Sequence, residues 1–98
     1  NIKKVKPISY SVVKSGIIGL TRYLATYWPG IVRSNALCLG GVYDNQDKDF
    51  VKKISKLIPL GRMAKADEYL GIIKFLCSED SSYLNGAIIP VDGGRTSW

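Results

Sequence analysis

Tyr10 and Lys14 are the two residues whose types and spacing could do chemistry. They stand four positions apart in "ISYSVVKSGIIGL", residues 8–20, a stretch that is otherwise mostly apolar. On an α-helix this spacing corresponds to about 40° around the axis and about 6 Å along it, so the two side chains lie next to each other. An ammonium about 4 Å from a phenol favours the phenolate by about 4 kcal/mol at an effective dielectric constant of 20, or about three pKa units, and burial cancels part of this gain. The pair is therefore a candidate general acid/base that needs no histidine.

A surface contact is the structural alternative for such a pair, because tyrosine and lysine are common on exposed helix faces. The surroundings argue against it, since residues 12–13 and 17–18 are apolar and glycines at positions 16 and 19 would let another backbone approach closely. Two buried polar groups kept without a function would be costly. We therefore expect both side chains to face a cleft on a largely buried helix.

The helix that positions this pair is predicted over residues 9–28. Its apolar residues step by four, three, four and three, which draws one continuous stripe: Val13, Ile17, Leu20, Leu24 and Tyr27. Ser9 is the predicted N-cap, with Pro7 before it, and Pro29 and Gly30 end the helix. We expect this helix to be covered on more than one side.

The remaining elements follow in the order strand, helix, helix, strand. A strand is predicted over residues 31–39, ending in Gly40-Gly41, and a last strand over residues 87–91. Between them lie predicted helices over residues 45–58 and 66–78, of which the first has an inner face made of Phe50, Val51, Ile54, Leu57 and Ile58. Two strands joined by a helical crossover form a parallel pair, and such a sheet needs further strands and helices on both faces. The sequence therefore predicts the later half of a larger α/β domain.

Composition and charge bound the class of protein. The 98 residues, 46% hydrophobic and 22% charged, fit one small globular domain, and no apolar run approaches the roughly 18 residues of a membrane span. The net charge is +6, but the lysines are scattered and no aromatic residues are interleaved with them, so we expect a solvated surface and no nucleic-acid binding.

The residue types present in the chain exclude two further kinds of site. The chain has no histidine and no cysteine cluster, so neither a zinc site nor a histidine-based triad is expected. Cys38 and Cys77 are predicted to be buried free thiols, as in a reducing compartment, and no secretion signal is seen. A cytoplasmic location is expected.

Five blocks of the sequence resemble, in order, the short-chain dehydrogenase/reductase family. "YSVVKSGIIGLTRYLA" is similar to its active-site helix with Tyr-x-x-x-Lys, "VRSNAL" to the next strand and "LGGV" to the loop after it. "PLGRMAKADE" resembles the start of the next helix, and "SSYLNGAIIPVDGG" the closing segment, so that the blocks cover residues 8–94. The resemblance implies that residues 1–98 are the C-terminal part of a single Rossmann-like, doubly wound parallel-sheet oxidoreductase domain, with three helices and two strands.

The resemblance also implies roles for particular residues. Tyr10 would give a proton to a carbonyl or take one from an alcohol, while Lys14 would lower the pKa of Tyr10 and hydrogen-bond the nicotinamide ribose. Gly40, Gly41 and Val42 would line the nicotinamide side, with the backbone of Val42 meeting the carboxamide. The cofactor would be NAD or NADP, the substrate a small carbonyl or alcohol, and the assembly a homo-oligomer. The segments "GGRTSW" and "GLTRYLATYW" resemble bacterial members linked to sugar or flagellin-glycan modification. Reductases of acyl-carrier-protein-bound ketones and sugar dehydrogenases share most of the same blocks, so the substrate stays open.

The chain departs from the family pattern at several points. Leu39 stands where the family usually has proline, and Asp44 where it often has threonine. The glycine-rich phosphate loop, the catalytic serine and the asparagine of the preceding helix are not in this sequence, so the 98 residues alone are expected to bind dinucleotide poorly and to turn over little. A non-catalytic piece that acts only in self-association is the alternative function.

Overall fold

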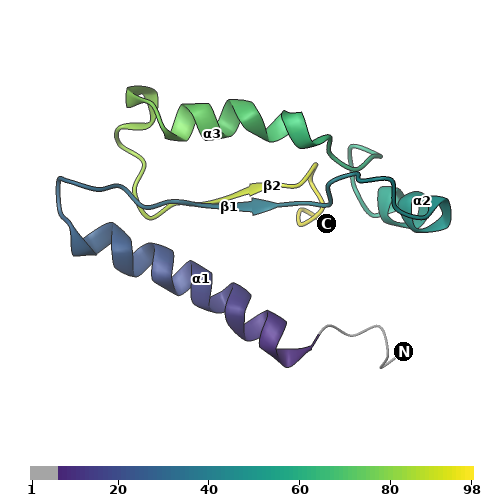
Figure 1. The fold of residues 1–98 in the computed structure, drawn as a ribbon, viewed down its shortest axis with the longest axis horizontal. Helices are drawn as coiled ribbons and strands as arrows, with labels where there is room; N and C mark the ends of the chain where they lie inside the picture. The colour runs from purple at the N-terminus through teal and green to yellow at the C-terminus, as the bar shows by residue number, and fades with distance from the viewer. Residues whose placement is uncertain (1–6) are drawn as a thin grey trace. The chain divides into compact units, whose positions relative to one another are not determined.

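The computed structural model describes residues 7–98. The helices are α1 (Ile8–Tyr27), α2 (Lys48–Lys56) and α3 (Leu70–Leu76), with short 3₁₀ turns η2 (Ala66–Tyr69) and η3 (Glu79–Ser81) before and after α3. Strands β1 (Ala36–Leu39) and β2 (Ile88–Val91) pair in a two-stranded parallel sheet (Figure 1). The predicted α/β class, element order and parallel pair are thus confirmed. None of the helices in this described part is long and apolar enough to cross a membrane.

Two compact units divide the chain. One holds the residues up to Ala36 together with Leu84–Ile88, and the other holds Leu37–Tyr83 together with Ile89–Trp98. The division crosses both strands, so each unit contains one end of the strand pair. Each unit is described by itself below.

In the first unit, α1 begins directly after Pro7, which takes the N-cap position with φ −57° and ψ 147°. Ser9 therefore lies inside the first turn, and its prediction as N-cap is wrong. The fixed φ of proline suits the start of a helix, so the helix begins one residue earlier than expected.

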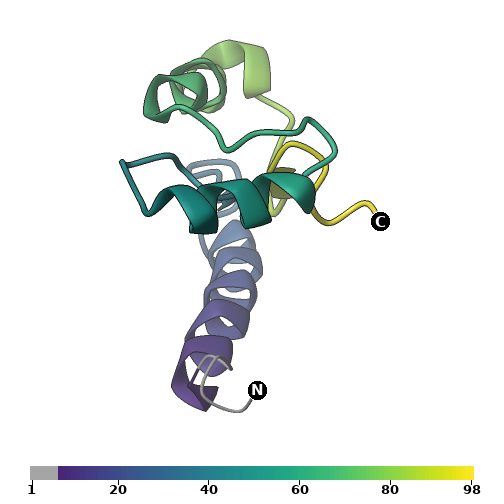
Figure 2. The same ribbon diagram turned by 90° about the vertical axis from the view of Figure 1, so that its right-hand side faces the viewer.

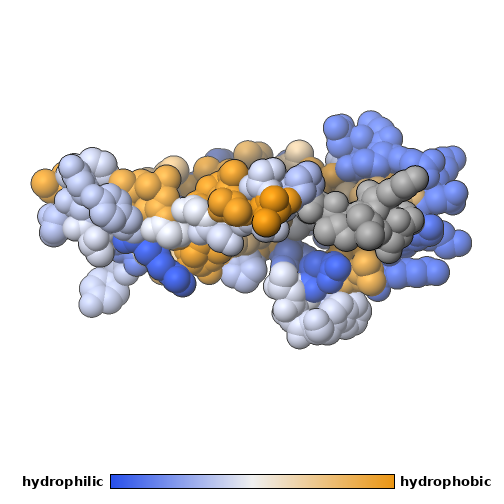
Figure 3. All heavy atoms as spheres, turned by 90° about the horizontal axis from the view of Figure 1, so that it is seen from below, coloured by the Kyte–Doolittle hydropathy of each residue, from blue (hydrophilic) through white to orange (hydrophobic). Residues whose placement is uncertain are grey.

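The apolar stripe predicted for α1 is exposed, contrary to expectation. Val13, Ile17 and Leu20 are 59%, 46% and 54% exposed. The buried side of the helix instead carries Thr21, whose hydroxyl donates to the Ile17 carbonyl (2.8 Å), beside half-buried Ala25. Within this unit the loop before β2 meets α1 near the helix C-terminus, where Asn85 donates to the Ala25 carbonyl. Most of the stripe is at the surface, and hydrophobic patches are visible on the α1 face (Figure 3).

Two asparagines hold the first unit together, and each uses both ends of its side-chain amide. Asn85 donates to the Ala25 carbonyl of α1 (2.8 Å) and accepts from the Ser34 amide (3.0 Å). Asn35 donates to the Leu84 carbonyl (3.0 Å) and accepts from the Ala87 amide (3.0 Å). Together with a backbone bond from the Gly86 amide to the Ser34 carbonyl (2.7 Å), these side-chain bonds join the two segments ahead of the strand pair. Strand β1 begins only at Ala36, so it is shorter than the strand predicted over residues 31–39.

In the second unit, α2 is shorter than the helix predicted over residues 45–58. The Asp47 carboxylate caps it by accepting from the amides of Asp49 (3.2 Å) and Phe50 (3.4 Å), while Asn45, at φ 54°, cannot belong to the helix. Of the predicted inner face, Ile58 is buried, but Phe50 and Leu57 are 49% and 44% exposed. The prediction of the inner face of this helix is therefore only partly correct.

The chain after β2 packs closely against the segment that follows α2 (Figure 2). Gly93, at φ 64°, accepts from the Leu60 amide (3.1 Å), and a Cβ at Gly93 would stand 2.8 Å from Cγ2 of Ile58. At the end of the chain, the Trp98 indole donates to the Leu57 carbonyl (3.1 Å). Only glycine fits at Gly93, because both its φ and its surroundings exclude a side chain.

Both cysteines are exposed, so their prediction as buried thiols is wrong. Cys38 lies in the second half of β1, and Cys77 directly follows α3. Apolar neighbours in sequence indicate a hydrophobic element, but they do not show that another element covers it.

The start of α3 is fixed by one ion pair. Glu68 receives two hydrogen bonds from the Arg62 guanidinium (2.6 and 3.0 Å) and one from the Lys65 amide (2.9 Å). The hydrogen bonds from Arg62, followed by that from Lys65, lower the pKa of Glu68 from 4.5 to about 2. Glu68 therefore ties the turn before η2 to the helix that follows.

We predict that Asn85→Ala lowers the free energy of unfolding by about 1–2 kcal/mol, because two hydrogen bonds of about 1 kcal/mol each are lost. Asn85→Asp keeps an acceptor for the Ser34 amide but places a carboxylate oxygen against the Ala25 carbonyl oxygen, so its loss should be at least as large. Urea unfolding followed by circular dichroism measures both variants. An unchanged midpoint for Asn85→Ala would show that the two hydrogen bonds of the Asn85 amide do not contribute to stability.

For Glu68, we predict that the stability advantage of the wild type over Glu68→Gln depends on pH. Since folding lowers the pKa of Glu68, the advantage should be complete above about pH 4.5 and should disappear as the pH falls towards 2. Both side chains are partly exposed, so 1 M salt should reduce the advantage. Thermal unfolding from pH 2 to 7 tests this, with Asp67→Asn as a control that removes a charge without touching Arg62. A difference that stays constant with pH would contradict the prediction.

Candidate functional site

Tyr10 and Lys14 lie side by side on α1. The Lys14 ammonium nitrogen stands 5.4 Å from the centre of the Tyr10 ring, over its face, where the ring quadrupole attracts a cation. Tyr10 is 43% exposed and Lys14 is exposed, so the largely buried setting expected for the pair is wrong. The pair is a phenol and a cation that an external molecule can reach.

Gly40, Gly41 and Val42 follow β1 and belong to the second unit. Gly40 continues the strand pairing, since its amide donates to the Val91 carbonyl (3.0 Å). Val42 forms a parallel bridge with Ala64, in which the Gly41 carbonyl and the Tyr43 amide make the hydrogen bonds (2.9 and 2.8 Å). The Val42 N–H therefore lies outside this ladder.

The Gln46 side chain holds the loop after Val42. Its amide nitrogen donates to the Val42 carbonyl (2.9 Å), and its oxygen accepts from the Asp44 amide (2.7 Å). The carbonyl of Val42 thus already has a partner within the loop. Sequence reasoning missed this role of Gln46, although a glutamine five residues after a glycine pair is compatible with such a return contact.

Packing within the chain requires glycine at Gly40 and leaves little room for a side chain at Gly41. A Cβ at Gly40 would stand 2.8 Å from Cα of Asp92, and one at Gly41 would stand 3.1 Å from Cε of Met63. The first contact is with backbone, which cannot move aside as a flexible side chain can. Close approach at these glycines is therefore explained within the second unit, without any bound molecule.

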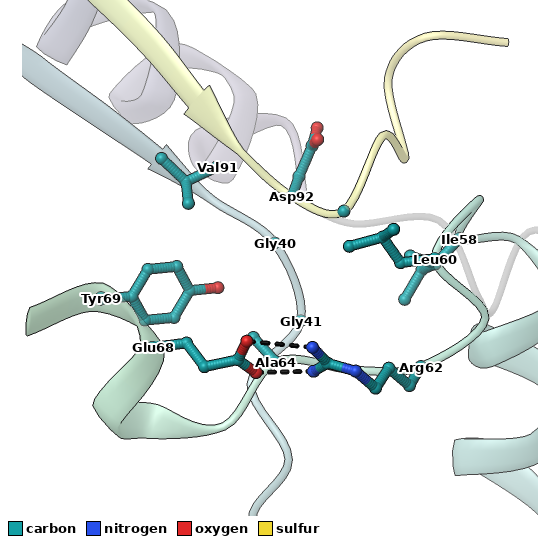
Figure 4. A pocket seen from close by; sticks show the side chains of 11 residues that line it. Gly40, Gly41, Ile58, Leu60, Arg62, Ala64, Glu68, Tyr69, Val91 and Asp92 are labelled. Carbon is teal, nitrogen blue, oxygen red and sulfur yellow. Dashed lines mark hydrogen bonds and ion pairs between the residues drawn. The ribbon is translucent and has the colours of Figure 1, made fainter. Parts of the chain in front are cut away.

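A cavity of about 140 Å³ lies beside these glycines (Figure 4). Its wall is backbone at Gly40, Gly41 and Gly93, apolar at Ile58, Leu60, Ala64 and Val91, and polar at Arg62, Glu68, Tyr69 and Asp92. All of these residues belong to the second unit. Of the residues that sequence analysis proposed for the site, Gly40 and Gly41 line the cavity.

The acidic groups at the cavity are engaged locally. Asp92 accepts from the Thr96 hydroxyl (2.8 Å), and from the amides of Gly94 (3.0 Å) and Thr96 (3.3 Å). The Thr96 hydroxyl is the main cause of a lowered pKa of Asp92, which burial partly opposes. Figure 4 shows the carboxylate directed away from Tyr69. The Asp92 carboxylate is therefore hydrogen-bonded within the turn that follows β2.

Tyr69 is a feature of the cavity that sequence reasoning missed. Its side chain is only 6% exposed, and its hydroxyl oxygen is buried with no hydrogen-bond partner among residues 7–98. The only signal in the sequence is a tyrosine at the start of an amphipathic helix, which usually indicates packing alone.

Comparison with known proteins identifies the family. A family model described as enoyl-(acyl carrier protein) reductase matches residues 3–96. Meso-2,3-butanediol dehydrogenase of Serratia marcescens is 38% identical over 93 residues, which cover 90% of this chain and 37% of that protein. NADP-dependent mannitol dehydrogenase of Hypocrea jecorina is 39% identical over 93 residues, which cover 91% of this chain and 35% of that protein.

A solved structure agrees with these relatives. The crystal structure of a short-chain dehydrogenase from Leptospira borgpetersenii with bound NAD+ superimposes with a TM-score of 0.84 at 40% identity, covering 89% of this chain and 35% of that one. The chain therefore spans little more than a third of the length of the proteins it matches. With the family model matching nearly its whole length, the chain belongs to the short-chain dehydrogenase/reductase family of oxidoreductases.

Proposed function

We propose that the protein carrying this chain transfers a hydride between a nicotinamide cofactor, NAD or NADP, and a carbonyl or alcohol carbon, with Tyr10 as the general acid/base. The observation that carries the proposal is the Lys14 ammonium 5.4 Å from the centre of the Tyr10 ring, on a helix that resembles the family's active-site helix. When bound, NADH or NADPH would supply the hydride for reduction, and NAD+ or NADP+ would accept it in oxidation.

Tyr10 handles the proton. In the reducing direction, the carbonyl oxygen gains negative charge as its carbon receives the hydride, and the Tyr10 hydroxyl gives that oxygen its proton. The positive charge of Lys14 stabilises the phenolate that remains, because opposite charges attract. In the oxidising direction, the phenolate takes the proton back from the alcohol.

The residues present fit a nicotinamide cofactor in two respects. The exposed Lys14 ammonium can donate to a ribose hydroxyl, and the Val42 N–H lies outside the backbone ladder and can donate to a carboxamide oxygen. Gly40 and Gly41 place no side chain beside that amide. We assign Gly40, Gly41 and Val42 to the cofactor side on these grounds.

The relatives support a small alcohol or carbonyl substrate and leave both cofactors open. Butanediol and mannitol name the substrates of two relatives, one of which is NADP-dependent, while NAD+ is bound in the Leptospira structure. We therefore propose a substrate of the diol or sugar-alcohol class.

We also propose that the protein self-associates through α1. Val13, Ile17 and Leu20 are exposed on one stripe of this helix, and burying such apolar area against a second copy would be favourable.

Tyr10→Phe is predicted to reduce the catalytic rate of the protein carrying this chain by about 100-fold or more, since general acid/base groups contribute about 10²- to 10⁴-fold. Cofactor oxidation is followed by absorbance at 340 nm, with a small diketone, a keto-sugar and a ketoacyl thioester offered separately. Tyr23→Phe, on the same helix, is the matched control and should keep full activity. Full activity in Tyr10→Phe would refute the role of Tyr10, and activity on the thioester alone would refute the substrate class.

For self-association, Ile17→Glu is predicted to shift the protein towards monomers, because a carboxylate cannot be buried unpaired at an apolar contact. Ser15→Glu adds the same charge to α1 away from the stripe and should leave the assembly unchanged. Sedimentation velocity at micromolar concentration measures both. If the wild type is monomeric, or if both variants sediment as the wild type does, α1 is not the interface.

A further inference from the structure

Val42 directs both of its backbone polar groups to the same edge of the chain. The Gly41 carbonyl accepts from the Ala64 amide (2.9 Å), and the Tyr43 amide donates to the Ala64 carbonyl (2.8 Å). In a trans peptide group the C=O and the N–H point in opposite directions. The N–H and the C=O of Val42 therefore both point away from Ala64, to the other edge of this short extended segment.

The side-chain amide of Gln46 binds two backbone groups on that edge. Its nitrogen donates to the Val42 carbonyl (2.9 Å), and its oxygen accepts from the Asp44 amide (2.7 Å). One planar amide thus pairs with this edge as a peptide group of a neighbouring strand would. Within residues 7–98 no group accepts from the Val42 N–H, so Gln46 covers the carbonyl of Val42 and leaves its donor open.

A residue in the left-handed region brings the Gln46 side chain back to this edge. Asn45 has φ 54°, a conformation that asparagine adopts more readily than most residues. Asp47, the next residue after Gln46, caps α2 with its carboxylate. All of these residues belong to the second unit, and Gln46 is half-buried. The Gln46 contact therefore joins the loop after β1 to the start of α2.

We propose that Gln46 is a positioning residue, which orients the carboxamide of a bound nicotinamide through Val42. Because the Val42 carbonyl is already paired, Val42 presents a donor to that carboxamide, and the carboxamide oxygen is the atom that meets it. Holding the loop before the cofactor arrives also reduces the entropy that binding costs. This inference rests on the proposed function, in which the Val42 N–H donates to the carboxamide oxygen.

Gln46→Met tests the proposal in the protein carrying this chain, because methionine is similar in length and lacks the amide. We expect the dissociation constant of NAD or NADP, measured by isothermal titration calorimetry, to rise about three- to tenfold, the value of one hydrogen bond. ADP-ribose, or its 2′-phosphate where NADP is the cofactor, lacks the nicotinamide, so its affinity should stay within about twofold. The catalytic rate at saturating cofactor should also change by less than about twofold, since Tyr10 and Lys14 are untouched.

Two further variants make the test specific. Gln46→Glu keeps an acceptor for the Asp44 amide but turns a carboxylate oxygen towards the Val42 carbonyl oxygen, so it should weaken dinucleotide binding as Gln46→Met does. Lys48→Met changes an exposed side chain at the start of α2 and should leave the affinities for the dinucleotide and for ADP-ribose unchanged.

Amide hydrogen exchange without cofactor tests whether Gln46 holds the loop. In Gln46→Met the Asp44 amide should exchange about three- to tenfold faster, while the Tyr43 amide, which is bound to Ala64, should keep its rate. Unchanged exchange of the Asp44 amide, equal losses of affinity for the dinucleotide and ADP-ribose, or no loss for either would each overturn the proposal. If the wild type binds neither NAD nor NADP, the proposed function fails, and this inference fails with it.

Discussion

Where β1 and β2 end, the backbone lies so close to its neighbours that no side chain fits between them. The shape of the second unit depends on this close contact. Gly40 packs on the Cα of Asp92, and Gly93 packs on Ile58, each at a distance that a Cβ would reduce to 2.8 Å. These contacts join the strand ends to the segment after α2. The cavity, the Asp92 turn and the position of Tyr69 all surround this junction, so a methyl group at Gly40 or Gly93 would disturb them together.

The order and type of the elements could be predicted from sequence because they depend on local pattern. The spacing of apolar residues in α1, the breakers after it and the short apolar segments of the two strands each act over a few residues. The side-by-side position of Tyr10 and Lys14 follows from helix geometry alone, and it is found in the structure. What these patterns give is the identity of an element and the side of it that is apolar.

Burial and long-range bonding could not be predicted in the same way. An apolar stripe such as Val13 and Ile17 shows that a face can be buried, but it does not show what covers it. The bonds of Asn35 and Asn85 join residues some fifty positions apart, and nothing local signals them. The Tyr69 hydroxyl has no hydrogen-bond partner among residues 7–98, a property of the three-dimensional structure that no spacing in the sequence records.

The two indole rings of the chain fall one in each compact unit. Trp28 ends α1, with its ring 4.6 Å from that of Tyr27, and Trp98 is anchored to the Leu57 carbonyl in the other unit. Tryptophan fluorescence therefore has one reporter in each unit. Replacing either indole by phenylalanine leaves a single tryptophan, so with light that excites tryptophan and not tyrosine the melting of one unit can be followed optically without labelling.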